Sequence, residues 1–330
     1  MQTFLPYLFL LILFYVLEAS YFCIANKYNI IDTPNYRSSH TTTTIRGGGI
    51  LFPIAIFIWY FQWGFSYPLF VAGLLVISLI SFIDDIKPLK SGLRTIFQII
   101  AVEFSLLELP LQIDWYWYPL LFIIIVGTKN AYNFMDGING ITGAYSLITL
   151  LTLWYINRFV AEFTFTSLLL VVILALVIFN FFNFRSKAKC FAGDVGSVSM
   201  AFIVLFLMMQ LIIDTRNYIY IILLLVYGLD TVTTIFFRLI RRENILQAHR
   251  THFYQFLANE KKWPHLKVAA LYSLIQLFFN LIVVVYANGK GAVYNNFIVF
   301  VFVFVSGILF VSVRFFVEGN SRLLKKTAAV

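Results

Sequence analysis

Carboxylates gather at two places where a long apolar segment ends or begins. Asp84 and Asp85 stand side by side at the end of one apolar segment, and Asp194 lies between Gly193 and Gly196 at the start of another. Adjacent carboxylates at the edge of a membrane are costly unless a cation or a proton relay uses them. An aspartate at a helix N-terminus could steady an assembly of phosphate and metal. Ion pairs at a solvated helix end, or a helix cap, would explain the same residues without any chemistry.

A third polar segment joins two apolar segments and is rich in amide and carboxylate oxygens. It includes Asn133 and Asp136, and its full sequence over 130–140 is Asn-Ala-Tyr-Asn-Phe-Met-Asp-Gly-Ile-Asn-Gly. Oxygens of this kind beside glycine turns suit a hard cation or a nucleotide. An ordinary turn rich in Asn, Asp and Gly is the alternative for this segment taken alone.

Three basic residues precede a run of glycines near the N-terminus. Arg46 precedes the glycine triplet 47–49 directly, and Arg37 and His40 lie a few residues earlier. Glycine lets the backbone approach a ligand closely or begin a helix under strain. A flexible turn would explain the glycines alone, but the basic neighbours favour anion binding.

Further cations lie close to the carboxylates along the chain. Lys87, Lys90 and Arg94 follow the aspartate pair, and Lys189 precedes Asp194 by five residues. We expect these side chains to neutralise the phosphates of a substrate, because charge-assisted contacts to phosphate are among the stronger hydrogen bonds.

The last polar loop contains three of the four histidines. His249 and His252 are three residues apart, so their rings share one face if the loop is helical there. Arg250 lies between them, and no cysteine or carboxylate completes a ligand set. The pattern therefore favours a grip on phosphate over a transition-metal site.

The composition places these residues in a membrane protein. The chain has 330 residues, of which 61% are hydrophobic and 12% charged, with a mean hydropathy of +0.87. A soluble domain is about half apolar and about one quarter charged. The net charge of +9 could suggest nucleic acid, but the Lys and Arg residues lie mostly in short loops between apolar segments, so we expect no nucleic-acid partner. The two cysteines predict neither a disulfide framework nor a metal site.

We predict an all-α, polytopic transmembrane protein in which residues 1–330 form a single integral membrane domain. Eleven apolar segments are long enough to be considered as spans. No internal repeat is visible. The predicted spans are 4–24, 50–64, 67–83, 95–109, 115–129, 140–157, 163–182, 198–214, 218–237, 266–287 and 296–316.

The distribution of Lys and Arg predicts the orientation. Alternate loops and the C-terminal end contain 21 of the 24, and the opposite side contains only Arg158, Arg216 and Lys290. Short loops rich in Lys and Arg stay in the cytoplasm. An odd number of spans then places the N-terminus outside and the C-terminus in the cytoplasm. Five cytoplasmic loops would form the active site: 25–49, 84–94, 129–139, 183–197 and 238–267.

The order of these motifs resembles the polyprenyl-phosphate N-acetylhexosamine-1-phosphate transferases (MraY/WecA-like). The shared motifs run from Arg-Gly-Gly-Gly through Asp-Asp, Asn-x-x-Asn-Phe-Met-Asp-Gly and Gly-Asp-Val-Gly-Ser to the last loop rich in His and Arg, so they span nearly the whole chain. The resemblance implies a multi-pass enzyme of the cytoplasmic (inner) membrane that uses Mg²⁺ or Mn²⁺. It also implies a UDP-sugar donor and an undecaprenyl phosphate acceptor, and it allows a homodimer.

The resemblance also implies roles for the matching acidic and amide residues. Asp84 and Asp85 would be the pair that activates the lipid phosphate and takes part in catalysis. Asn133 and Asp136 would belong to the nucleotide and metal pocket, with Asp136 counted among the catalytic residues. Asp194 would be catalytic and would bind the metal.

The last loop carries the one departure from the family pattern. By the resemblance, His249, Arg250 and His252 would grip the donor diphosphate or shape the sugar pocket, with His252 as a catalytic residue. Many relatives have a His-x-His-His cluster, whereas this chain has His-Arg-Thr-His at 249–252 followed by Tyr254-Gln255. This form looks more like the subgroup that initiates O-antigen or capsule repeat units, and no muramyl-pentapeptide signature is present.

The implied reaction gives a polyprenyl-diphosphate sugar and UMP. We favour direct attack by the lipid phosphate on the donor β-phosphorus over a phospho-aspartate intermediate. The donor could be UDP-N-acetylglucosamine or another UDP-N-acetyl amino sugar such as UDP-N-acetylfucosamine. A membrane transporter is the rival from another class. Transporters tend to have repeated halves and polar residues at the membrane midplane, whereas here the polar residues lie at the cytoplasmic edge and no repeat is visible. A CDP-alcohol phosphatidyltransferase would need a long aspartate signature that is absent.

The orientation can be tested with reporters. A reporter fused after Val330 should lie in the cytoplasm, and one inserted near Asn288 should lie outside, because the loop charges orient the spans. The opposite location at either site would contradict the arrangement of eleven spans and the common face of the five loops.

Overall fold

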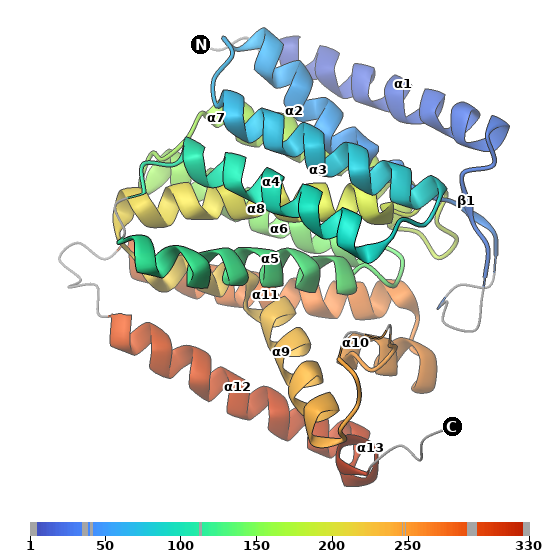
Figure 1. Cartoon of the computed structure of the whole chain (residues 1–330), viewed down its shortest axis with the longest axis vertical. Helices are drawn as coiled ribbons and strands as arrows, with labels where there is room; N and C mark the ends of the chain where they lie inside the picture. The colour runs from blue at the N-terminus through green and yellow to red at the C-terminus, as the bar shows by residue number, and fades with distance from the viewer. Residues whose placement is uncertain are drawn as a thin grey trace.

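The computed structural model is built almost entirely of helices and describes residues 5–34, 39, 42–111, 114–245, 247, 249–288 and 296–325. Most long helices run side by side along the bundle in Figure 1, while α9 crosses them steeply. The fold is therefore all-α, as predicted. The longer helices are α1 (Leu5–Lys27), α2 (Leu51–Gln62), α3 (Pro68–Ile86), α4 (Ser91–Glu108), α5 (Tyr118–Phe134), α6 (Ile141–Phe159), α7 (Thr166–Asn183), α8 (Gly193–Thr215), α9 (Leu225–Ile240), α11 (His265–Ala287) and α12 (Asn296–Glu318).

Short elements complete the chain between and after these helices. A two-residue antiparallel pair joins Ile31–Asp32 (β1) to Thr44–Ile45 (β2). The remaining short helices are η1 (Gly48–Ile50), η2 (Trp115–Trp117), η3 (Tyr218–Leu224), α10 (Phe253–Gln255), η4 (Phe256–Glu260) and α13 (Asn320–Leu324).

Each of the eleven predicted spans coincides with one of the longer helices. Within the described residues, seven helical segments are long and apolar enough to cross a membrane, so the polytopic membrane class is confirmed. The other four are shorter, as in α2 with 12 residues, or more polar, as in α4, which contains Arg94, Glu103 and Glu108. The number of eleven spans stays a prediction.

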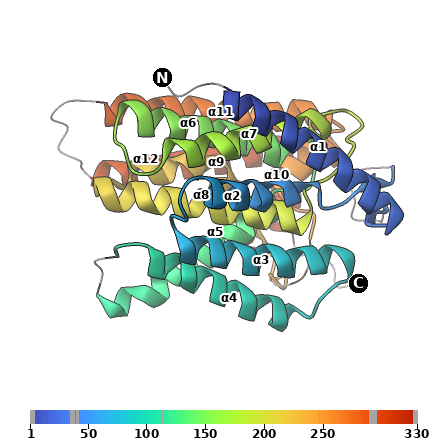
Figure 2. The same cartoon turned by 90° about the horizontal axis from the view of Figure 1, so that it is seen from above.

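Helix α8 is the centre of the bundle. Its apolar segment is 78% buried, whereas that of α12 is only 17% buried. Figure 2 shows α8 in the middle, with α3 and α4 on one side and α6, α7 and α11 on the other. Helix α8 packs against α2, α3, α5 and α6. Any residue at the start of α8 is therefore held by several neighbours at once.

Buried hydrogen bonds fix α9 against the bundle. The Gln276 side chain accepts from the Tyr145 hydroxyl at 2.6 Å and from the Val226 backbone N–H at 3.0 Å, and it donates to the Ile222 carbonyl at 2.8 Å. Val226 lies where the 3₁₀ turn 218–224 becomes α9, so its N–H needs a partner there. Inside a membrane such groups must be satisfied by protein, because no water is available. These bonds hold the helix that carries Asp230.

The polar loops meet at one end of the bundle. The strands β1 and β2 lie at the same end as α10 in Figure 1. Ile45 also forms a parallel bridge with Cys190, and the Phe191 N–H donates to the Ile45 carbonyl at 2.8 Å. The segment before α2 and the segment before α8 are thereby joined, although they are far apart in the sequence.

Candidate active site

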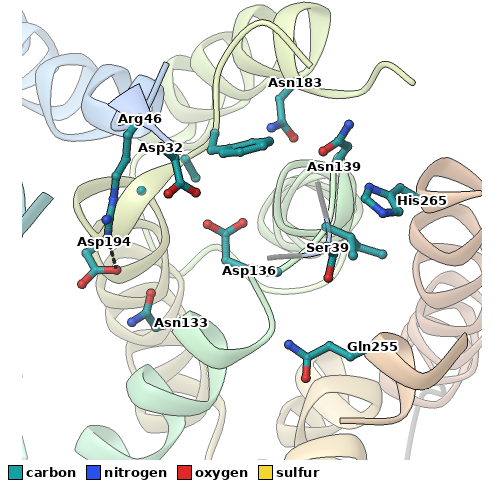
Figure 3. Close-up of a pocket in the computed structure, with 15 residues that line it drawn as sticks. Asp32, Ser39, Arg46, Asn133, Asp136, Asn139, Asn183, Asp194, Gln255 and His265 are labelled. Atoms are coloured by element: carbon teal, nitrogen blue, oxygen red, sulfur yellow. Dashed lines mark ion pairs between the residues drawn. The ribbon is translucent and has the colours of Figure 1, made fainter. Parts of the chain in front are cut away.

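A polar cavity of about 280 Å³ opens at this end of the bundle. Figure 3 shows the carboxylates of Asp32, Asp136 and Asp194 around the same space, with Arg46 beside Asp194. Four of the five predicted loops contribute to its lining. The lining residues are Asp32, Ser39, Arg46, Asn133, Asp136, Gly137, Ile138, Asn139, Asn183, Phe191, Ala192, Gly193, Asp194, Gln255 and His265.

The glycine triplet serves close backbone packing. The N–H groups of Gly48 and Gly49 donate to the carbonyls of Phe191 and Ala192 at 2.9 and 3.1 Å. A side chain at Gly49 would overlap the backbone of Gly196 in α8. The glycines therefore allow two backbone segments to pack closely. Of this segment's predicted anion-binding residues, Arg46 lines the cavity, where it can contact a ligand. Arg37 and His40, which also favoured anion binding, lie outside the described residues.

Asp85 caps α8 from the neighbouring helix α3. Its carboxylate accepts from the backbone N–H groups of Asp194 and Val195, both at 2.9 Å, and from Arg46 Nε at 2.6 Å. The Asp85 side chain is fully buried. A carboxylate at a helix N-terminus is stabilised by the helix dipole and by the unpaired N–H groups. Asp85 is thus a positioning residue that fixes the start of α8 and the direction of Arg46.

Asp84 holds the loop that follows α3. It accepts from the Leu89 N–H at 2.6 Å and from Arg94 Nη1 at 2.8 Å. Arg94 also lies 3.8 Å from the Asp194 carboxylate. Both members of the aspartate pair therefore have cationic and backbone partners. Asp85 contacts Arg46 in the cavity lining, and Asp84 contacts Arg94, which lies near Asp194.

Asp194 is a partly exposed carboxylate of the cavity lining. Its side chain is 23% exposed and lies 3.6 Å from Arg46 Nη2, within the cavity lining. Asp136 lies in the loop between α5 and α6 and lines the same cavity. Burial raises the pKa of Asp136 to about 6, because the charged form loses solvation. Asp136 and Asp194 in one cavity, with Arg46 between Asp85 and Asp194, can bind a cation and a phosphate together.

Amide side chains shape the floor of the cavity. The Ser197 hydroxyl donates to Asn133 Oδ1 at 2.5 Å, which ties α5 to α8. Asn139 donates to the Arg185 carbonyl at 3.0 Å, and Asn183 Oδ1 accepts from the Gly140 N–H at 2.9 Å. These bonds hold the loop 135–140 against the segment before α8.

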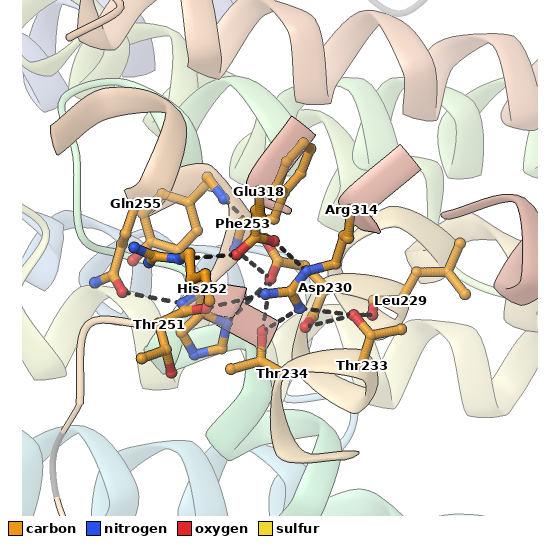
Figure 4. Close-up of polar contacts among 12 residues, drawn as sticks. Leu229, Asp230, Thr233, Thr234, Thr251, His252, Phe253, Gln255, Arg314 and Glu318 are labelled. Atoms are coloured by element: carbon orange, nitrogen blue, oxygen red, sulfur yellow. Dashed lines mark hydrogen bonds and ion pairs between the residues drawn. The ribbon is translucent and has the colours of Figure 1, made fainter. Parts of the chain in front are cut away.

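A second buried aspartate organises the last loop. Asp230 in α9 accepts from the N–H groups of Phe253 and Tyr254 at 2.9 and 3.1 Å, and from the Tyr272 hydroxyl at 2.6 Å (Figure 4). His252 Nδ1 lies 3.3 Å from the same carboxylate. Asp230 therefore caps α10, and this places Gln255 in the cavity lining.

Arg314 links the last long helix to this network. Its guanidinium donates to the hydroxyls of Thr233 and Thr234 at 3.0 and 2.9 Å and to the Thr251 carbonyl at 3.1 Å. Figure 4 shows Glu318 on the other side of the guanidinium, where Nε donates to it at 2.5 Å. The buried cation thus holds the segment before α10 against α9 and α12.

His249 and His252 stand beside the cavity and are not in its lining. The rings of His249 and His252 stack with centroids 4.9 Å apart, and the Phe134 ring lies 6.2 and 6.3 Å from them. The buried His252 Nε2 has no hydrogen-bond partner among the described residues. Burial, with the nearby His252 and Arg238, lowers the pKa of His249 to about 3, so that ring is neutral at pH 7.

The structure brings together some of the predicted site residues and separates others. Arg46, Asn133, Asp136 and Asp194 line the cavity, and Asp84 and Asp85 support it from α3. The exposed side chains of Lys87, Lys90 and Lys189 and the half-buried Arg250 are not in the lining. Six polar residues of the lining had no role predicted from the sequence, although Gln255 and His265 lie in the last polar loop. These six are Asp32, Ser39, Asn139, Asn183, Gln255 and His265.

Residues 67–212 match the family described as glycosyl transferase family 4. The chain is 24% identical over 332 residues to a probable undecaprenyl-phosphate N-acetylglucosaminyl 1-phosphate transferase of Bacillus subtilis (strain 168), which covers 92% of each chain. It is 27% identical to the phospho-N-acetylmuramoyl-pentapeptide-transferase of Thermotoga neapolitana, over 64% of this chain and 74% of the relative. The enzyme of that name from Streptococcus equi is 34% identical over 43% and 49% of the two chains.

The cap at α10 predicts a stability effect. Asp230→Asn should lower the stability of the purified protein by about 1–3 kcal/mol, because one oxygen replaces two and buried donors lose a partner. The measurement is the apparent melting temperature in detergent, together with the rate of proteolysis in the segment 241–252. Asp214→Asn, at an exposed aspartate near the end of α8, is the matched control. Equal effects of the two substitutions would contradict the capping role.

Proposed function

Because this chain belongs to glycosyl transferase family 4, the MraY/WecA-like membrane sugar-1-phosphate transferases, we propose that it makes a polyprenyl-diphosphate sugar from a UDP-N-acetylhexosamine and undecaprenyl phosphate. The protein is a multi-pass protein of the inner membrane. We place the reaction at the cytoplasmic end of the bundle, where the basic loops lie. There the reaction would start the synthesis of a cell-surface polysaccharide.

The observation that carries this proposal is the pairing of carboxylates with a cation in one cavity. Asp136 and Asp194 line it together with Arg46 and the amide of Asn133. A transferase of this kind must bring two phosphate-bearing substrates together and offset their mutual repulsion. The cavity supplies oxygen ligands for a divalent cation and a fixed guanidinium for phosphate.

In the proposed reaction, an oxygen of the lipid phosphate attacks the donor β-phosphorus. A new P–O bond forms to the lipid phosphate, and the bond from the β-phosphorus to the bridging oxygen breaks. That oxygen leaves on UMP, so the sugar stays attached to the transferred phosphorus. Asp85 and Arg46 contribute by holding the start of α8 still, so that the ligands of the cavity keep their places.

The residues of the cavity fit the Mg²⁺ or Mn²⁺ that the family resemblance implies. Within the described residues, no three His, Cys, Asp or Glu side chains form a complete metal site. Mg²⁺ is usually bound through one or two carboxylates plus substrate phosphates and water, so a complete protein cage is not needed. Asp194 and Asp136 would hold the ion, and when bound it would offset the charge that develops on the phosphates.

The hydrogen bonds of Asp84 and Asp85 favour direct attack over a mechanism in which either of these two aspartates is phosphorylated. Asp85 accepts three hydrogen bonds and Asp84 accepts two, so neither carboxylate is free to act as a nucleophile without losing partners. Loss of such partners would leave buried donors unsatisfied, at a cost of about 1–3 kcal/mol each.

We further propose UDP-N-acetylglucosamine as the donor. The relative from Bacillus subtilis, which matches nearly the whole chain, carries that sugar in its name. The His-Arg-Thr-His form at 249–252 supports the subgroup that begins O-antigen or capsule units. A panel of UDP-sugars, including UDP-N-acetylfucosamine, with undecaprenyl phosphate and purified protein tests the choice through the rate of UMP release. No release with any donor would contradict the proposed function.

Metal dependence is the first prediction of this assignment. Asp194→Asn should abolish UMP release while the protein stays folded, because the amide cannot replace the charge of a carboxylate on a divalent cation. Excess EDTA should abolish turnover by the unchanged protein, and added Mg²⁺ should restore it. Asp214→Asn provides a control at the other end of the same helix. Full turnover in EDTA would contradict the metal site.

The substitution Arg250→Lys distinguishes a contact with the donor diphosphate from a role of the charge in membrane orientation alone. If its guanidinium contacts the donor diphosphate, Arg250→Lys should lower kcat/KM by about ten- to a hundred-fold, because the planar bidentate contact is lost. Insertion into the membrane should be unchanged, since lysine keeps the charge. Arg242→Lys, at an exposed arginine nearby, is the control. Equal kinetics of the two variants and the unchanged protein would assign Arg250 a structural role.

A further inference from the structure

Lys129 is a buried cation that has no role in the reaction as proposed above. It lies in α5 with only 1% of its surface exposed, and its ammonium has no hydrogen-bond partner among the described residues. An unpaired ammonium in a low-dielectric environment is expensive. Ionisable residues inside membrane helices are rare and usually mark the path of a substrate. A partner that is not part of the folded chain would remove this cost.

The position of Lys129 relates it to the cavity. It precedes Asn133 by four residues, so the two side chains lie on one face of α5 with about 6 Å of helix rise between them. Asn133 lines the cavity and bonds to Ser197 of α8. Lys129 is not in the lining, because it lies one turn farther from the loop end of the helix. It therefore stands behind the cavity floor, on the membrane side.

The cations near Asp194 differ in whether they line the cavity. Lys129 interacts electrostatically with Asp194 and Arg94. Arg46 lies 3.6 Å from Asp194 and belongs to the cavity lining. Arg94 lies 3.8 Å from Asp194 but, like Lys129, is not in the lining. The oxygens of Asp194 already face the two arginines, so this carboxylate does not form an ion pair with Lys129. Arg46 thus faces the cavity, and Lys129 and Arg94 lie outside its lining.

We propose that Lys129, together with Arg94, binds the phosphate of the acceptor lipid on the membrane side of Asp194. This inference rests on the proposed function and adds a separate site for the second substrate. A phosphate monoester carries about 1.5 to 2 negative charges at pH 7. It would give Lys129 an anionic partner and would add a second anion to Arg94, whose present partner is Asp84 at 2.8 Å. A nucleotide reaches the open cavity from water, whereas a phosphate on a lipid chain arrives from the membrane side, toward which Lys129 is buried behind the cavity floor. The acceptor oxygen would then approach the donor from the opposite side of Asp194.

Binding of two lipids that differ only in the phosphate tests this site. The affinity of the full chain is measured in detergent, in EDTA, for undecaprenyl phosphate and for undecaprenol. The unchanged protein should prefer the phosphate, and Lys129→Met should reduce this preference by about ten- to a hundred-fold, as expected for a charge-assisted contact. Affinity for UDP should stay the same. Lys325→Met, at an exposed lysine after α13, should leave the lipid preference unchanged.

Thermal unfolding separates this role from a structural one. Lys129→Met removes an unpaired buried charge and keeps an unbranched side chain of similar length, so its melting temperature should equal or exceed that of the unchanged protein. If the methionine variant does not fold, Lys129→Gln provides the same comparison of the two lipids.

Two outcomes would overturn the inference. An unchanged preference for the phosphate lipid in the folded variant would mean that Lys129 does not bind the acceptor. A loss of UDP affinity with unchanged lipid binding would assign Lys129 to the donor site. Failure of the proposed function gives a different result, namely an unchanged protein that binds both ligands and releases no UMP with any donor.

Discussion

The buried carboxylate of Asp85 is the contact on which the arrangement of the site depends. It accepts two backbone N–H groups at the start of α8 and the guanidinium of Arg46. One group from α3 thus joins the central helix to the loop before α2. A buried carboxylate is stable only when such donors satisfy it, and a helix N-terminus supplies them together with a favourable dipole. Because Asp194 is the second residue of α8, the cap also decides where that carboxylate stands.

A buried carboxylate also caps a helix at the last loop, with different partners. Asp230 in α9 caps α10, as Asp85 in α3 caps α8. In each case a long helix holds the start of a segment that comes later in the chain. The two caps position Asp194 and Gln255, which line one cavity from different loops. The cavity thus presents a few partly exposed polar groups, while buried polar residues fix the directions of their elements.

The sequence predicted the helices well because their signal is local. Apolar segments of sufficient length are enough to find every long helix, although the predicted ends differ from the observed ones by up to seven residues, at the start of α9. The motifs also led to Arg46, Asn133, Asp136 and Asp194, because carboxylates, amides and glycines at helix junctions are unusual in a membrane protein. The lysines 87, 90 and 189 were selected by the same argument from charge. Their exposed side chains agree as well with a role in orienting the chain in the membrane.

The pairings that build the site could not be predicted from local patterns. The contact between Asp85 and α8 spans 109 residues, and that between Asp230 and Phe253 spans 23. Which partner a buried aspartate finds depends on how the helices pack, and this is not encoded in the spacing of one motif. For the same reason Asp32 and His265 were not assigned to the site, although both lie in polar loops. Lys129 was counted only as a loop charge, because its burial depends on the helices that pack against α5.

The most direct test of the account follows the fate of the donor β-phosphorus. Purified protein is supplied with undecaprenyl phosphate, Mg²⁺ and UDP-N-acetylglucosamine labelled with ³²P at that position, and the lipid and nucleotide products are separated. Transfer of a sugar-1-phosphate predicts that all of the transferred label appears in the lipid and that the released UMP carries none. Label in released UDP, with only the sugar on the lipid, would contradict the central claim.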